Sequence, residues 1–166
     1  MAPRIDAFFS CSFRSEDKAV NSFFEALSKG IGIQLTNVDT AATSTPPDVA
    51  KKKIEASQLL IAVCVRRDAL TADKFTMPQA VQDEISIPFG LGIPAIMFVE
   101  NGVQFEGFKT NYGTYHTFDR AKLQEPQMLE TVVRALFEAT TSMRSAANPN
   151  NPAGQSARAA AGSAVL

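Results

Sequence analysis

The sequence predicts an α/β domain with a flavodoxin-like, three-layer α/β/α architecture and a central parallel sheet of about five strands in the order 2-1-3-4-5. Short apolar strands alternate with amphipathic helices along most of the chain. Two strands, residues 59–65 and 93–99, are apolar runs without alternation, as is typical of strands covered on both faces. The 166 residues, 45% of them hydrophobic, suffice for one core but not for two ordinary domains.

The first strand is expected at residues 5–13, where an aromatic-rich run ends at a polar cluster. Apolar residues then recur at helical spacing, with Ser15 as the expected N-cap and Gly30 as the end of the helix. These apolar residues are Val20, Phe23, Phe24 and Leu27. The second strand is expected at residues 31–35 and is followed by a loop of turn-forming residues.

Thr45 is expected to cap the second helix, with Pro46 at its first position. A third helix follows the strand at 59–65 and carries the motif PQAVQDEISIP. An edge strand is expected at residues 114–118 and a long amphipathic helix at 126–144. We therefore expect a domain at 1–144. Residues 145–166 hold too little apolar bulk to order themselves, so we expect a flexible tail or linker there.

The charge balance and the two cysteines indicate which partners and which kinds of metal site the protein is not expected to have. With 16 basic and 17 acidic side chains, the formal charge of −1 favours neither nucleic acid nor a membrane surface as a partner. Cys11 and Cys64 have no CxxC spacing, and His116 is the single histidine, so the usual zinc sites are excluded and no metal is expected. We expect reduced core thiols in a cytoplasmic protein, without a signal peptide or a membrane span.

Two adjacent carboxylates, Asp83 and Glu84, lie on the third helix. Met77, Val81 and Ile85 form a stripe with a spacing of four, the face that must meet the sheet. Asp83 is expected to point into solvent, opposite this stripe, whereas Glu84 lies at its margin. A glutamate beside an apolar stripe is more often a solvated residue than a functional one.

Several stretches, in the right order, resemble the Toll/interleukin-1 receptor (TIR) domain family. SFRSED at residues 12–17 is similar to the family's first box, and KKKIEASQLLIAVCVRRD is similar to its helix, turn and third strand. DEISIPFGLGIPAIMFV is similar to the segment that contains the family's helix glutamate and fourth strand. The resemblance covers about residues 5–140.

The resemblance implies an NAD+ nucleosidase or ADP-ribose cyclase in which Glu84 is the catalytic residue and NAD+ is a substrate rather than a cofactor. It also implies self-association through TIR–TIR contacts, a sensor or effector partner, and a role in bacterial antiviral defence. Two departures are notable. Ala80 stands where the family often has tryptophan, and Pro88 is expected to kink or end the helix.

Breaking the nicotinamide–ribose bond produces a cationic sugar but a neutral leaving group, so one carboxylate is enough. Ser10, Ser12 and Arg14 are the candidate donors for the pyrophosphate. Asn37 and Asp39 are candidates to line the same cleft, although such residues in turns usually bond their own backbone. Phe9 and Phe13 are candidates for stacking on the adenine or nicotinamide ring, although a core position in the buried strand is the more common role for such aromatic residues.

Two other functions remain open from the sequence. One is a non-catalytic TIR-type oligomerisation module, which the absence of tryptophan favours. The other is a nucleoside deoxyribosyltransferase-like enzyme, which also combines this type of sheet with a glutamate nucleophile and a Gly-x-Pro turn like the one at residues 92–94. His116 is more readily explained as a hydrogen-bonded residue than as a catalytic base.

Overall fold

Five strands form one parallel sheet in the order β2-β1-β3-β4-β5, which confirms the predicted topology. The computed structural model describes residues 4–37, 47–104 and 114–147. The strands are β1 (Ile5–Ser10), β2 (Ile33–Thr36), β3 (Leu59–Cys64), β4 (Ala95–Glu100) and β5 (Thr114–Phe118). All six residues of β3 are buried, because this central strand is covered on both faces.

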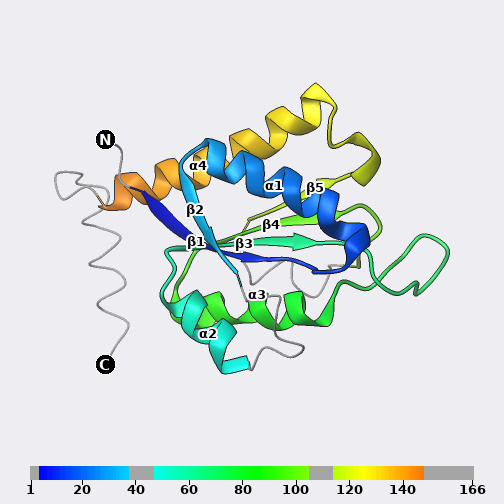
Figure 1. The fold of residues 1–166 in the computed structure, drawn as a ribbon, viewed down its shortest axis with the longest axis horizontal. Helices are drawn as coiled ribbons and strands as arrows, with labels where there is room; N and C mark the ends of the chain where they lie inside the picture. The colour runs from blue at the N-terminus through cyan, green and yellow to red at the C-terminus, as the bar shows by residue number, and fades with distance from the viewer. Residues whose placement is uncertain (1–3, 38–46, 105–113, 148–166) are drawn as a thin grey trace.

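Helices cover both faces of the sheet, with α1 (Lys18–Gly30) and α4 (Pro126–Ala147) on one side and α2 (Pro47–Glu55) and α3 (Gln79–Leu91) on the other (Figure 1). Side chains that alternate along the strands separate into two apolar cores. Phe9 and Phe98 face α1 and α4, whereas Phe8 and Met97 face α2 and α3. Each strand side chain therefore points toward one of these two cores.

The first helix begins later than the sequence predicts. A short 3-10 turn, η1 (Ser15–Asp17), precedes α1, and Ser15 makes no capping hydrogen bond. Asp17 occupies the N-cap position of α1, but its carboxylate binds the guanidinium groups of Arg67 and Arg120 instead of the helix amides. Because the Asp17 carboxylate is held in these two ion pairs, it makes no capping hydrogen bond to the helix amides.

Pro88 does not end the third helix. α3 continues through this proline to Leu91 and stops at Gly92, whose positive φ of 66° ends the helix in the left-handed region. The backbone N–H groups of Gly92 and Ile93 both donate to the Pro88 carbonyl. Because proline has no N–H, the bond to the Glu84 carbonyl four residues earlier is missing, and the helix nevertheless continues to Leu91.

The remaining boundaries shift by a few residues. The described part of α2 starts at Pro47, and the predicted cap Thr45 and first helical position Pro46 both lie outside the described residues. α4 extends past Arg144 to Ala147, into the expected tail, and residues 148–166 are likewise outside the described part. None of the helices in the described ranges combines the length and apolar character that a membrane crossing requires.

Candidate active site

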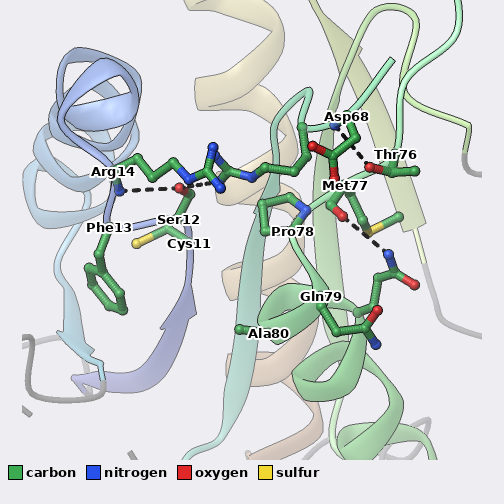
Figure 2. A pocket seen from close by; sticks show the side chains of 12 residues that line it. Cys11, Ser12, Phe13, Arg14, Asp68, Thr76, Met77, Pro78, Gln79 and Ala80 are labelled. Carbon is green, nitrogen blue, oxygen red and sulfur yellow. Dashed lines mark hydrogen bonds between the residues drawn. The ribbon is translucent and has the colours of Figure 1, made fainter. Parts of the chain in front are cut away.

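A cavity of about 690 Å³ lies where the carboxyl ends of β1 and β3 meet the start of α3 (Figure 2). Parallel sheets of this order commonly bind ligands at this edge. The wall of the cavity consists of three segments. They are the residues that follow β1, the residues that follow β3, and the first turn of α3 with the chain leading into it. The lining residues are Cys11, Ser12, Phe13, Arg14, Arg67, Asp68, Thr76, Met77, Pro78, Gln79, Ala80 and Gln82.

Glu84 lies one helical turn beyond Ala80, directly behind this wall and not among its lining residues. Its side chain is buried, at 8% exposure, and the Ser10 hydroxyl donates a hydrogen bond of 2.5 Å to Glu84 Oε2. No hydrogen bond from a described residue reaches the other oxygen, Oε1. Asp83, its neighbour, is exposed and accepts a bond from Gln79, so the two carboxylates separate as the helical spacing predicts.

Burial raises the pKa of Glu84 from 4.5 to about 7, because a desolvated carboxylate loses the hydration that favours its charged form. The Ser10 hydrogen bond acts in the opposite direction, and the nearby charge of Asp83 raises the pKa further. A carboxyl group with a pKa near neutrality can hold or release a proton at physiological pH. Such a shift beside a cavity is typical of functional carboxylates.

Two arginines contribute positive charge to the cavity wall. Arg14 is largely exposed, with 60% of its side chain accessible, and pairs weakly with Glu16 at 3.8 Å. Arg67 is 10% exposed, donates to Ser12 Oγ at 2.6 Å and lies 3.4 Å from Asp17 Oδ2. Arg67 is not among the binding residues predicted from the sequence. The signal that points to it is its position in the segment that follows the central strand, since residues there reach the ligand-binding edge of a parallel sheet.

A buried charge cluster supports this wall from behind. Asp17 is 1% exposed and bridges Arg67 to Arg120, whose Nη2 lies 2.9 Å from Asp17 Oδ1. Arg120 also donates through Nε and Nη2 to both oxygens of Glu100 at the end of β4, each at 2.9 Å. The Glu100 hydrogen bonds raise the pKa of Arg120 more than any other interaction does. The cluster ties β4, η1 and the chain after β3 together at the carboxyl edge of the sheet.

The predicted binding residues divide into three groups. Ser12, Arg14 and Ala80 line the cavity, and Ser10 lies behind it against Glu84. Phe9 does not reach the cavity: its ring is 1% exposed and packs in the core beneath α1 and α4, so it is not placed to stack on a ligand. Phe13 is 48% exposed and does line the cavity, which makes it the aromatic side chain placed for that role.

Asn37 follows β2 at the same edge of the sheet, and its backbone carbonyl accepts a bond of 2.7 Å from Lys53 Nζ. Asp39 lies outside the described residues. His116 is on β5, the edge strand that the sequence predicts, and burial lowers its pKa. It borders a different cavity, which is lined by residues at the start of β4 and along α4.

Cys11 and Cys64 are free and buried, and burial raises the pKa of each thiol to about 12, so both are protonated near neutrality. They occupy opposite faces of the sheet, in separate cores. Among the described residues, no group of three or more His, Cys, Asp and Glu side chains is arranged to hold a metal ion.

No protein-family model matches the sequence, and the search of curated proteins gives no significant match. Solved structures do match. The flavodoxin-like domain of a Synechococcus protein superposes with a TM-score of 0.50 at 11% identity, over 82% of this chain and 99% of that one. The fold is flavodoxin-like.

Other solved structures align with this chain at lower TM-scores. The CMP N-glycosidase BcmB of Clostridium botulinum has a TM-score of 0.48 at 16% identity, over 76% of this chain and 97% of that one. An oxidised flavodoxin 2 from Bacillus cereus has a TM-score of 0.46 at 8% identity, over 81% and 99%. Similarity at these identities concerns the fold.

Proposed function

We propose that this protein is an NAD+ nucleosidase that breaks the bond between nicotinamide and ribose, with Glu84 as its catalytic carboxylate. The observation that carries the proposal is the buried Glu84–Ser10 pair at the carboxyl edge of the sheet, directly behind an open, arginine-bearing cavity. The resemblance of the sequence to TIR domains agrees with this assignment, since Glu84 occupies the position of the family's helix glutamate.

The leaving group suits a site with one catalytic carboxylate. When the bond from ribose C1′ to the pyridinium nitrogen breaks, its electron pair neutralises the ring, so nicotinamide leaves without needing a proton. The sugar becomes a cation, and an ionised Glu84 stabilises it electrostatically. The positive charge of the bound substrate also favours the ionised form of Glu84 and so offsets the effect of burial.

Ser10 and Glu84 have complementary roles in this scheme. The Ser10 hydroxyl holds Oε2, which orients the carboxylate and leaves Oε1 for a ribose hydroxyl or for the developing cation. The sugar cation is then captured in one of two ways. Water attack gives ADP-ribose and a proton, whereas attack by an adenine nitrogen gives a cyclic ADP-ribose and a proton, with no water consumed.

The proposal includes self-association of the TIR type. Two large apolar side chains at the end of α3, Phe89 and Leu91, are 62% and 45% exposed. These residues also favour the second candidate function, a non-catalytic assembly module. An assembly module should show light scattering that increases with protein concentration and should leave NAD+ intact. Leu91→Glu should weaken the assembly and so lower the scattering.

The test is to incubate concentrated protein with NAD+ and separate the products by chromatography. Release of nicotinamide together with ADP-ribose or a cyclic isomer is expected. A parallel incubation with a deoxynucleoside and a second free base tests the transferase alternative. Absence of nicotinamide at high protein concentration, with or without a crowding agent, would contradict the proposed activity, and base exchange would replace it with the transferase.

A further inference from the structure

The hydroxyl of Ser12 is held so that it can only donate to a ligand. Its oxygen accepts two hydrogen bonds, one from Arg67 Nη2 at 2.6 Å and one from the backbone N–H of Arg14 at 3.3 Å. A serine hydroxyl has two acceptor positions and one proton, so both acceptor positions are filled. No described residue accepts that proton, and Ser12 lines the cavity. Figure 2 shows the Ser12 side chain beside Arg14 at the cavity wall.

Arg67 presents donors to the same cavity. Its Nη2 group is engaged by Ser12 and Asp17, whereas no hydrogen bond from a described residue involves its Nε or Nη1. Nη1 has one charged neighbour, Glu16 Oε1, at 3.8 Å. A guanidinium carries five N–H donors and no acceptor, so the remaining N–H groups also offer only protons.

The guanidinium of Arg67 is held in place before any ligand arrives. Asp17, which pairs with it, is fixed in turn by Arg120, and Arg120 is clamped by Glu100. An arginine ordered in this way loses little side-chain freedom on binding a ligand. Arg14, on the same wall, is 60% exposed and lacks such support.

We propose that Ser12 and Arg67 form the phosphate-binding wall of the cavity and that they hold the pyrophosphate of the dinucleotide substrate. This assignment rests on the proposed function for the identity of the substrate. A surface that offers donors and positive charge fits a ligand group that only accepts, as phosphate oxygens do. The described residues that line the cavity include two arginines, Arg14 and Arg67, and a single carboxylate, Asp68, so positive side chains outnumber negative ones there.

The experiment measures binding without turnover, by titrating ADP-ribose, ADP and adenosine into the 166-residue chain in a calorimeter. Wild type is expected to bind the two phosphate-bearing ligands more tightly than adenosine, and more weakly as salt rises. Arg67→Gln and Ser12→Ala are each expected to weaken ADP and ADP-ribose binding about 10- to 100-fold, the usual effect of losing hydrogen bonds to a charged group. Adenosine affinity should not change.

Arg66→Gln is the matched control. Arg66 is the neighbouring arginine, but its Nε bonds the Asn101 carbonyl and its side chain does not line the cavity, so ADP affinity should stay at the wild-type level. Arg67→Lys keeps the charge next to Asp17 and serves as the second variant if Arg67→Gln does not fold. It is expected to lose affinity as well, because an ammonium group cannot bind Ser12, Asp17 and a phosphate at once.

The outcomes separate the phosphate site from the proposed reaction. If the wild type does not bind ADP, or if folded Arg67→Gln and Arg67→Lys bind it as tightly as the wild type, the phosphate site is refuted. If the protein cleaves no NAD+ but binds ADP in an Arg67-dependent way, the site stands and the nucleosidase proposal fails. Glu84→Gln should abolish turnover while keeping ADP-ribose affinity.

Discussion

The Ser10 hydroxyl, at the end of β1, donates a 2.5 Å hydrogen bond to Glu84 Oε2 on α3. This bond joins two elements that lie far apart in the sequence and orients a buried carboxylate behind the cavity. It also opposes the effect of burial on the Glu84 pKa, because it stabilises the ionised form. Several testable consequences concern this pair and the charge cluster beside it.

Ser10→Ala should shift the pH dependence of catalysis. Without the hydroxyl, burial acts on Glu84 unopposed, so its pKa should rise above the wild-type value of about 7. The acid limb of the kcat/KM profile for nicotinamide release should then move to higher pH. Ser86→Ala is the control, since Ser86 is exposed on the same helix and bonds the Asp83 carbonyl. An acid limb that stays in place or moves to lower pH would show that the Ser10 bond does not tune Glu84.

Glu84 should make folding stability depend on pH. Its pKa is raised in the folded state, from 4.5 to about 7, so the folded protein retains a proton that the unfolded chain releases. The free energy of unfolding should therefore fall as pH rises between these two values, by roughly 3 kcal/mol in total for a shift of this size. The fall should be absent in Glu84→Gln.

Urea denaturation at a series of pH values measures this dependence. The stability difference between Glu84→Gln and wild type should be constant below pH 4.5, grow in favour of the variant up to about pH 7, and then level off. A difference that does not vary across this range would mean that Glu84 is not desolvated as the structure indicates.

Asp17→Ala should destabilise the fold. Asp17 is 1% exposed and pairs with Arg67, whose side chain is 10% exposed. Removing one partner of a buried pair leaves an uncompensated charge, so a loss of about 3 kcal/mol is expected. Glu16→Ala is the control: this carboxylate is 59% exposed and its pairs are 3.8 Å long, so the change should stay below about 1 kcal/mol. Equal losses in the two variants would refute the structural role of the cluster.

Gly102→Ala should also destabilise the protein. Gly102 has a φ of 90°, and a Cβ there would lie 2.9 Å from the Asp73 carbonyl oxygen. The backbone strain and this clash should cost at least about 1–3 kcal/mol, measurable as a lower Tm. Gly30→Ala is the matched substitution, because a Cβ at Gly30 meets nothing within 4 Å. It should leave Tm unchanged or slightly higher, and a Tm in Gly102→Ala no lower than in Gly30→Ala would contradict this reading.

The fold was predictable because its signals are local and regular. The apolar run at β3 and the helical spacing of Val81 and Ile85 each follow from burial on a known face. Element ends were less predictable, since they depend on distant partners. α1 begins at Lys18, and the carboxylate of its N-cap residue Asp17 bonds Arg120, which is more than a hundred residues along the chain.

The site was predictable only where one element determined it. Helical spacing alone separates Glu84 from Asp83. The hydrogen bond to Ser10 depends on how β1 and α3 pack, and the link from Ser12 to Arg67 joins residues 55 apart in sequence. Phe9 was predicted to reach the ligand but packs in the core that faces α1 and α4. Alternation along a strand separates its two faces, but it does not reveal which face meets the cavity until the helices on each face are assigned.

The most direct test compares Glu84→Gln with Asp83→Asn. These adjacent substitutions each remove one carboxylate from the same helix, one buried behind the cavity and one exposed. Nicotinamide release from NAD+ should fall by at least about 100-fold in Glu84→Gln, the lower end of what is lost when one group that stabilises transition-state charge is removed, and stay near wild type in Asp83→Asn. Equal activity in wild type and folded Glu84→Gln would contradict the assignment of Glu84 as the catalytic carboxylate.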